Sequence, residues 1–442
     1  MTILIENALV LTMNGEPPFT GSVGIEGNKI TLVARYDSGG VAGAMGADNP
    51  AQTVEEFKRK HAGELKVIPG RDRLVMPGLV NTHNHAPMSL MRSMADDIPL
   101  MEWLHKYIWP AEEKLTRELV VLGAQLAIAE MLLGGTTTFV DLYWMEEAVG
   151  EAAEAAGIRA VLSPTMIDFK RDAFERDVQT TFSRYAAGQC PSISVMAGAH
   201  SLYSCSRENL LRVRELAEQY GVGVNIHLAE TTDEAAIVRE RTGMTPAEYA
   251  DSLGLLTPRS LAVHCVHLSD SDIAIMVRSG ASVAHNPQSN MKIGNGVAPV
   301  AKMTAAGINV ALGTDGPCSN NDLDMIEEMR TAAFLQKSAT GDPLALPARE
   351  ALRMATANGA CAIGRGADLG RIEEGMTADI ILLDTCKAHL SPQLNMEGTL
   401  VYAAKAADVD TVIVDGRVVV EGRRLLTLDL EAILKEVDKV RW

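Results

Sequence analysis

The sequence lacks an excess of positive charge, and this shortage excludes one class of partner. Of its 442 residues 40 are Lys or Arg and 57 are Asp or Glu, so the formal charge is −17 with histidine taken as neutral. Binding to a phosphate backbone requires a basic stripe, whereas the basic clusters here are fragments such as 58–60. We therefore expect no nucleic-acid partner.

The chain also lacks paired cysteines, a leader segment and long apolar runs. Its six cysteines are scattered, without a C-x-x-C pair, as expected for reduced thiols. Residues 1–13 alternate apolar and polar side chains and include Glu6, unlike a signal peptide, and no run approaches the roughly 18 apolar residues of a membrane span. We expect a cytoplasmic protein without a membrane partner.

What the chain does contain is the composition of a folded globule, with 47% apolar and 22% charged residues. From Leu74 onward, apolar strand patterns alternate with amphipathic helical stretches, for example over 119–133, 208–220, 270–279 and 300–306. Strands are predicted over 78–82, 136–142, 159–163, 193–199, 222–228, 261–266, 281–285 and 309–314. Eight such units predict an α/β fold, a (β/α)₈ TIM-type barrel.

The two ends of the chain have a different pattern, that of short strands and turns. Strands are predicted over 3–13, 21–26 and 29–34 and, near the other end, over 378–384, 411–414 and 417–420. The stretch 37–49 holds four glycines and no apolar period, so we expect a loop there, followed by a short charged helix over 54–61.

Five histidines fall near the carboxyl ends of predicted barrel strands. His83 and His85 follow the first strand, and the others lie at the fourth, fifth and sixth strands: His200, His227 and His264. Barrel enzymes build their active sites at this rim. One histidine at a strand end is ordinarily a core residue, but five at one rim indicate a site.

Four of the rim residues form a plausible ligand set for one metal ion. Side chains two apart on an extended strand point the same way, so His83 and His85 can chelate together. His227 and Asp315 complete three nitrogens and one oxygen, which suits Zn²⁺ with an open position, although Fe²⁺ or Mn²⁺ can take the same ligands. Asp315 before Gly316 is also an ordinary turn residue. The fourth strand has no lysine to bridge two metals, which favours one ion per chain.

Two further residues are candidates for proton transfer beside such a metal. Glu230 lies three residues beyond His227, where it can reach both substrate and water, although the same place suits the first-turn charge of a following helix. His264 lies on an apolar strand and is either a neutral core residue or a hydrogen-bond partner of the attacking water.

These motifs together resemble a known family. The segments 75–85, 227–230, 263–265, 285–290 and 313–316 resemble the amidohydrolase superfamily. Within it, 291–296 and 319–321 are similar to the branch of 5-methylthioadenosine/S-adenosylhomocysteine deaminases. The resemblance runs along most of the chain and implies that both chain ends build one small β-sandwich beside the barrel. The domains expected are then 1–75 and 366–442 for the sandwich and 76–365 for the catalytic barrel.

The resemblance also implies an activity, the metal-dependent hydrolytic deamination of 5′-substituted adenosines to inosine-type products and ammonia. It implies the metal ligands His83, His85, His227 and Asp315. Glu230 would protonate the ring nitrogen, and His264 would stabilise the attacking hydroxide. Asp315 would take the proton of the water and pass it to the departing ammonia.

The same resemblance places residues against the nucleoside. Glu112 falls where the family binds the ribose hydroxyls, which a carboxylate can accept, and His200 contacts the nucleoside. Trp103 and Ser319 are further candidates for the substrate pocket. Barrels of this size often associate, so the partners considered are a small-molecule nucleoside and further copies of the chain in a homo-oligomer, while the sequence leaves the oligomeric state open. Two alternatives remain: an aminohydrolase or chlorohydrolase of another heteroaromatic, such as a triazine or a guanine-like base, and a silent barrel that only binds a ligand.

Overall fold

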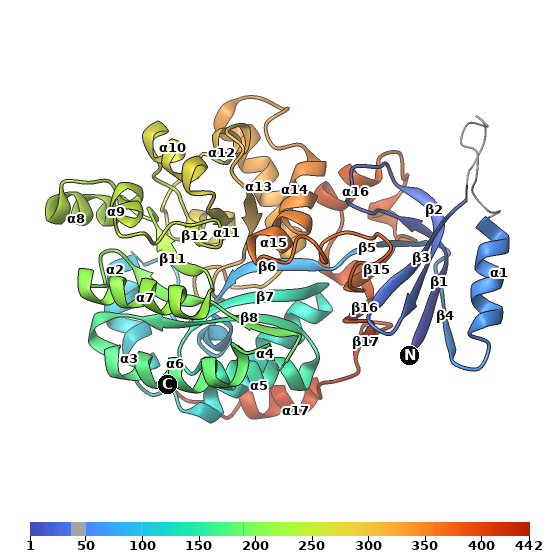
Figure 1. Ribbon diagram of the computed structural model, residues 1–442, viewed down its shortest axis with the longest axis horizontal. Coiled ribbons are helices and arrows are strands. Elements are labelled where there is room, and N and C mark those ends of the chain that lie inside the picture. Colours follow the sequence, from blue (N-terminus) through green and yellow to red (C-terminus); the bar gives the residue numbers. More distant parts are fainter. Residues whose placement is uncertain (37–49, 99, 189) are drawn as a thin grey trace.

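The computed structural model describes residues 1–36, 50–98, 100–188 and 190–442, so the loop expected at 37–49 lies outside the described residues. The chain forms a helix-wrapped barrel and, beside it, a smaller sheet in which blue and red strands mix (Figure 1). Because blue and red mark the two ends of the sequence, the figure shows directly that the ends fold together.

The larger sheet is the predicted parallel barrel. Its strand order is β14-β13-β12-β11-β10-β8-β7-β6, with β9 paired to β8. The strands are β6 (Leu79–Asn84), β7 (Thr136–Tyr143), β8 (Arg159–Met166), β9 (Ile193–Val195), β10 (Ala197–Ser201), β11 (Val224–Leu228), β12 (Leu261–His264), β13 (Ser282–His285) and β14 (Val310–Leu312). All eight predicted strands are present, and the predicted fourth strand is interrupted at Met196 and so appears as β9 and β10.

Hydrogen bonds from side chains of the first strand, β6, link it to β14 and the residues that follow, where the barrel closes. Thr82 Oγ1 donates to the carbonyl of Leu312 at 2.8 Å, and Asn81 Nδ2 donates to Thr314 Oγ1 at 2.8 Å. The backbone N–H of Asp315 donates to the carbonyl of His83 at 3.0 Å. These bonds fix Asp315 next to the end of β6, where the first two rim histidines stand.

Helices cover the outside of the barrel between successive strands (Figure 1). They are α4 (Arg117–Leu133), α5 (Glu146–Ala156), α6 (Arg171–Tyr185), α7 (Arg207–Tyr220), α8 (Thr232–Thr242), α9 (Pro246–Ser252), α10 (Asp270–Ser279), α11 (Pro287–Lys292), α12 (Val300–Ala305), α13 (Met325–Thr340), α14 (Ala348–Met354) and α15 (Ala357–Ala362). Short helical turns follow β6 and β8: η1 (Ala86–Met91), α2 (Leu100–Trp103), η2 (Leu104–Ile108), α3 (Trp109–Glu112) and η3 (Asp168–Lys170). The turns after β6 carry Trp103 and Glu112 over the rim.

The second sheet joins the two chain ends, as expected. Its order is β18-β17-β16-β15-β5-β1-β2-β3, with β4 also paired to β1. The strands are β1 (Thr2–Val10), β2 (Phe19–Glu26), β3 (Lys29–Arg35), β4 (Leu65–Pro69), β5 (Arg73–Pro77), β15 (Ile380–Asp384), β16 (Val409–Val414), β17 (Arg417–Glu421) and β18 (Arg424–Leu425). The link between the ends is β5 against β15, antiparallel, with Pro77 opposite Ile380. Helix α1 (Pro50–Lys60) packs on this sheet, and the remaining helices are η4 (Ala388–Leu390), α16 (Met396–Tyr402), η5 (Ala406–Asp408) and α17 (Leu430–Val437).

A buried ion pair fastens the barrel to the small sheet at the amino ends of the strands. Arg159, the first residue of β8, is 2% exposed and donates to both oxygens of Asp379 at 3.1 Å. The same guanidinium donates to Asp415 at 3.3 Å and to the carbonyl of Pro191 at 3.2 Å.

Two sequence-based expectations concern the whole chain. All six cysteines lie among the described residues and all are free thiols, as predicted. Within the ranges that the structure describes, every helix is too short or too polar to cross a membrane.

Candidate active site

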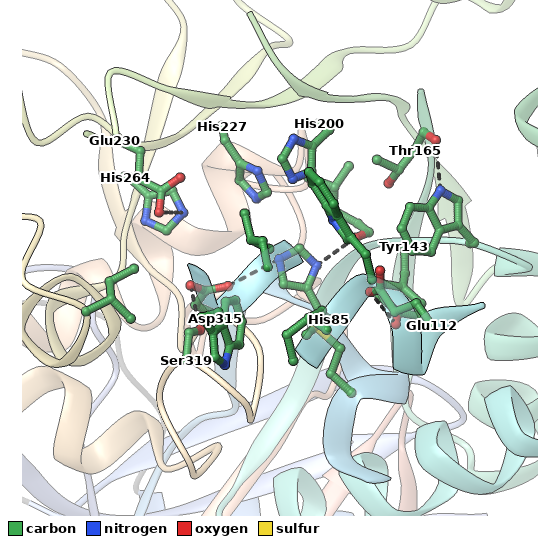
Figure 2. Close-up of a pocket in the computed structure, with 18 of the residues that line it drawn as sticks. His85, Glu112, Tyr143, Thr165, His200, His227, Glu230, His264, Asp315 and Ser319 are labelled. Carbon is green, nitrogen blue, oxygen red and sulfur yellow. Dashed lines mark hydrogen bonds and ion pairs between the residues drawn. The ribbon is translucent and has the colours of Figure 1, made fainter. Parts of the chain in front are cut away.

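A cavity opens at the carboxyl ends of the barrel strands (Figure 2). It holds about 690 Å³ of empty space, counting the part that is open to solvent. Its lining includes nine of the ten residues singled out from the sequence: His85, Trp103, Glu112, His200, His227, Glu230, His264, Asp315 and Ser319. The tenth, His83, lies behind them and is fully buried.

Two of the predicted metal ligands, His83 and His85, face one carboxylate oxygen of a third, Asp315. Asp315 Oδ1 lies 3.3 Å from His83 Nε2 and 3.2 Å from His85 Nε2. His85 Nδ1 contacts the carbonyl of Leu142 at 2.7 Å. The Nδ1 proton donates in that bond, and Nε2 is the ring atom that faces Asp315.

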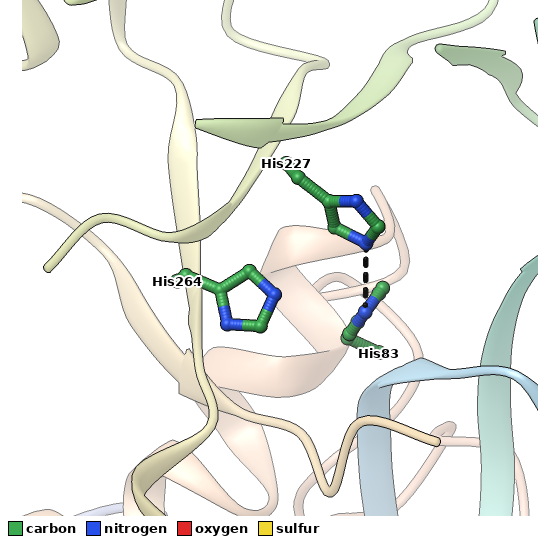
Figure 3. Close-up of side chains that lie close together, drawn as sticks. All are labelled: His83, His227 and His264. Atoms are coloured by element: carbon green, nitrogen blue, oxygen red, sulfur yellow. Dashed lines mark hydrogen bonds between the residues drawn. The ribbon is translucent and has the colours of Figure 1, made fainter. Parts of the chain in front are cut away.

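The fourth predicted ligand faces the same point from β11. His227 Nε2 lies 3.2 Å from His83 Nε2, with the ring of His264 beside both (Figure 3). Burial lowers the pKa of His83 to about 3 and that of His227 well below its ordinary value. Both rings are therefore neutral near pH 7, with lone pairs to offer. Three nitrogens and one oxygen that converge in this way fit a divalent ion such as zinc.

Asp315 is held as a carboxylate, and its Oδ1, which faces the histidines, also accepts from the N–H of Gly316 at 2.7 Å. Burial raises its pKa, but hydrogen bonds with His83 and His85 outweigh that effect and hold the pKa well below its usual range. Its other oxygen, Oδ2, accepts from the hydroxyls of Ser289 at 2.6 Å and Ser319 at 2.9 Å. Ser319 thus lines the cavity, while its hydroxyl is engaged by Asp315.

Glu230 and His264 form a second pair beside the predicted metal ligands. Glu230 Oε1 accepts from Asn295 Nδ2 at 3.0 Å and lies 3.9 Å from His264 Nε2. His264 Nδ1 lies 3.0 Å from Asn290 Oδ1, to which it donates. The two asparagines therefore fix how the acid and the imidazole face the cavity.

The backbone at this rim is strained at several side chains that bear chemistry. Ala229, His264, Cys265 and Asp315 adopt φ angles of +50°, +71°, +51° and +63°. Residues with a Cβ rarely adopt this left-handed conformation, which costs of order 1–3 kcal/mol each. Such conformations concentrate at active sites, where they aim side chains that a regular strand would not.

Glu112 faces the cavity from the opposite side to Glu230 (Figure 2). It ends α3, is 7% exposed and accepts a hydrogen bond from Tyr143 Oη at 2.8 Å. Its other oxygen, Oε2, has no hydrogen-bond partner among the described residues. Burial raises the pKa of this carboxyl to about 7.

His200 and two basic residues complete the wall and its approach. Burial lowers the pKa of His200 to about 4, and its Nδ1 lies 2.8 Å from Ser204 Oγ. Lys170 places its ammonium 3.6 Å from the centroid of the Trp144 ring, a cation–π contact at the cavity wall. Arg171 turns away to pair with Glu208.

Sequence reasoning assigned no role to four residues that support the site: Tyr143, Ser289, Asn290 and Asn295. Each contacts a site residue through a side-chain hydrogen bond. Only their position in the sequence could have pointed to them, because Tyr143 ends the second barrel strand and the other three residues follow the seventh. That rim position is shared with every other residue of the site.

A parallel barrel with three histidines and an aspartate converging at its carboxyl rim defines a class, the metal-dependent barrel hydrolases. The sequence comparison gives the family. The chain belongs to the amidohydrolase family, whose sequence model matches residues 74–419.

Individual relatives match over nearly the full length. A 5-methylthioadenosine/S-adenosylhomocysteine deaminase of Pelotomaculum thermopropionicum is 46% identical over 99% of this chain and 97% of its own. A 5′-deoxyadenosine deaminase of Methanosarcina mazei is 43% identical, with 99% and 97% covered. Among solved structures, an adenosine deaminase from Xanthomonas campestris with bound zinc has a TM-score of 0.91 at 33% identity, covering 99% of this chain and 97% of that one.

Proposed function

We propose that this amidohydrolase removes the 6-amino group of 5′-substituted adenosines such as 5′-methylthioadenosine, S-adenosylhomocysteine and adenosine itself. Water enters at the ring carbon, ammonia leaves, and an inosine-type nucleoside remains. One observation carries the proposal: the cavity has a metal-type donor set and, across from Glu230, a carboxylate oxygen of Glu112 that finds no partner in the described part of the chain. The names of the relatives agree with this reaction.

The residues suited to hold one zinc ion per chain are His83, His85, His227 and Asp315, and Fe²⁺ or Mn²⁺ fits the same donors. Two overlapping sets of three potential ligand atoms, His83/His85/Asp315 and His83/His227/His264, each lie within 4.8 Å of one another. When bound, such an ion acts as a Lewis acid that lowers the pKa of water in its coordination sphere from 15.7 towards about 7.

The remaining chemistry falls to the side chains of the rim. Glu230 delivers a proton to the ring nitrogen beside the reacting carbon, with Asn295 holding its Oε1. His264, whose Nδ1 is held by Asn290, stabilises the attacking oxygen. Asp315 accepts the proton of the attacking water and returns it to the departing ammonia.

Nucleoside binding is assigned to the other side of the cavity. Glu112 accepts hydrogen bonds from the ribose hydroxyls, because its Oε2 is buried and has no partner among the described residues. His200 and Trp103 also line the cavity. A triazine or guanine-like base lacks the diol, so the rival substrate class leaves Glu112 unused.

The test is release of ammonia by the zinc-loaded protein, with and without a chelator. The substrates are 5′-methylthioadenosine, S-adenosylhomocysteine, 5′-deoxyadenosine, adenosine, guanine and an aminotriazine. We expect chelator-sensitive release from the adenosine compounds. If none of the adenosine compounds releases ammonia but guanine or the triazine does, the reaction type is supported and the proposed substrate class is overturned. A purified protein that takes up no metal would favour a silent barrel.

A further inference from the structure

We infer that Tyr143 positions Glu112 for the ribose diol and thereby makes the enzyme discriminate ribosyl from dideoxyribosyl substrates. The inference rests on the proposed function, which it deepens by assigning a specificity-determining residue. Tyr143 belongs to β7 and Glu112 to α3, so one hydrogen bond joins a barrel strand to the helical turns that lie over the rim.

The geometry divides the two carboxylate oxygens between two tasks. Oε1 of Glu112 accepts from Tyr143 Oη at 2.8 Å, whereas Oε2 is buried without a hydrogen-bond partner among the described residues. Figure 2 shows the phenol ring and the carboxylate together in the cavity wall. With Oε1 engaged, the carboxylate cannot rotate freely, and Oε2 is the atom left for the hydroxyls of a ligand. Carboxylate oxygens have the lone pairs to accept two vicinal donors.

The same hydrogen bond favours the charged form of the carboxyl. Burial raises the pKa of Glu112, and the Tyr143 hydroxyl opposes that effect by donating to the carboxylate. A hydrogen bond to the charged form stabilises it. Within the described residues, the acid forms no ion pair with Lys or Arg, which leaves Tyr143 as its one direct side-chain donor.

A second tyrosine–glutamate contact provides a matched comparison outside the cavity. Tyr185 on α6 is 1% exposed, and its hydroxyl lies 3.5 Å from Glu154 Oε2. Glu154 also accepts from Arg184 at 2.7 Å, so its charge does not depend on the phenol. Removing each hydroxyl in turn separates a positioning effect from the general cost of losing a buried phenol.

The experiment compares Tyr143→Phe with Tyr185→Phe on adenosine and on 2′,3′-dideoxyadenosine. For Tyr143→Phe we expect KM for adenosine to rise about tenfold, the usual effect of losing a hydrogen bond to a charged group, with kcat within about twofold. KM for the dideoxy substrate should stay unchanged, and Tyr185→Phe should change neither. In a Glu112→Gln background, Tyr143→Phe should have no further effect on KM.

Direct binding separates this inference from the proposed reaction. Calorimetry with inosine and 2′,3′-dideoxyinosine should show that Tyr143→Phe weakens only the inosine complex. A protein that prefers inosine through Tyr143 but releases no ammonia from adenosine would support the inference and overturn the proposed reaction. An enzyme that deaminates adenosine, but whose Tyr143→Phe variant loses affinity equally for both ligands, would overturn the inference alone.

Discussion

The two ends of the barrel strands treat buried polar groups in opposite ways. At the amino ends, Arg159 meets two carboxylates and a carbonyl, so the buried charge is fully compensated. At the carboxyl ends, Glu112 Oε2 and His83 Nδ1 have no hydrogen-bond partner among the described residues. The amino end of the barrel, the closed end, uses its polar groups to hold two sheets together. The carboxyl end, the open end, has buried polar atoms without such partners among the described residues, where we propose that a metal and a substrate bind.

The backbone φ angles also differ between the two ends of the strands. Before β8 and β13, the left-handed positions are Gly157 and Gly280, which have no Cβ and adopt φ of +73° and +70° without strain. At the other end of the strands, His264 and Asp315 adopt left-handed conformations with full side chains. At these positions the strained conformations belong to site residues that must be aimed, whereas glycine provides the turns that lead into the strands.

The largest effect is expected at the open end, from Glu230→Gln. The amide keeps the size of the side chain but cannot deliver the proton, so turnover should fall by about 10²–10⁴-fold. Metal content and Tm should stay at the wild-type values. Steady-state ammonia release and metal analysis measure both, with Glu240→Gln on the exposed face of α8 as control. Near-normal turnover would remove Glu230 from its role.

At the closed end, Arg159→Met should cost stability instead of chemistry. Removing one partner of a buried ion pair leaves an uncompensated charge and lowers the free energy of unfolding by about 3–5 kcal/mol. Urea unfolding measures this loss, and kcat of the folded protein should change little. Arg59→Met, which breaks an exposed contact with Glu56, should cost less than about 1 kcal/mol. Equal losses for the two variants would contradict the comparison.

Glu112 gives the open end a distinctive pH dependence of stability. Its pKa rises from 4.5 to about 7 on folding, so between these values the folded protein binds more protons than the unfolded chain. Its contribution is present below about pH 4.5 and is lost as pH rises to about 7, by about 3 kcal/mol in total. Unfolding curves of the metal-free protein from pH 4.5 to 7.5 should show that Glu112→Gln removes this part of the decline. Parallel curves for wild type and variant would contradict the shifted pKa.

How far the sequence alone predicts this molecule also differs between its regions. Eight barrel strands are visible because each is a buried run bounded by turn residues. The strands β4, β5 and β18 were not predicted. Leu65–Pro69 has one buried residue, Arg73–Pro77 runs almost directly into the first barrel strand, and Arg424–Leu425 is only two residues long. The pairing of β5 with β15 cannot be seen in the periodicity of the sequence, because the register between distant segments is set by packing.

The candidate site shows the same limit. His83, His85, His227 and Asp315 were placed together because residues at the ends of parallel strands must share one rim. The contact of Tyr143 with Glu112, or of Asn295 with Glu230, depends on rotamers and on loops that cross the rim. No spacing rule encodes such contacts, so they required coordinates.

The smallest effect is expected from a helix cap, which is part of neither the Arg159 ion pair nor the candidate site. Ser269 caps α10, because its Oγ accepts from the N–H of Asp272 at 3.2 Å. In the other direction, Asp272 Oδ2 accepts from the N–H of Ser269. Ser269→Ala should lower the free energy of unfolding by about 1 kcal/mol and leave kcat and KM unchanged. Thermal unfolding with parallel kinetics measures both. A change in kcat would show that strain at the rim is coupled to this helix.

The pairing of β5 with β15 has a consequence for how the chain folds during its synthesis. Pro77 lies two residues before the barrel begins at Leu79, whereas its partner Ile380 comes after the last barrel strand. Because the ribosome synthesises the chain from its amino end, the edge of β5 that pairs with β15 stays unpaired until the whole barrel has been synthesised. The barrel can form before the small sheet is complete. An interrupted chain would expose that edge, and with it a template for aggregation.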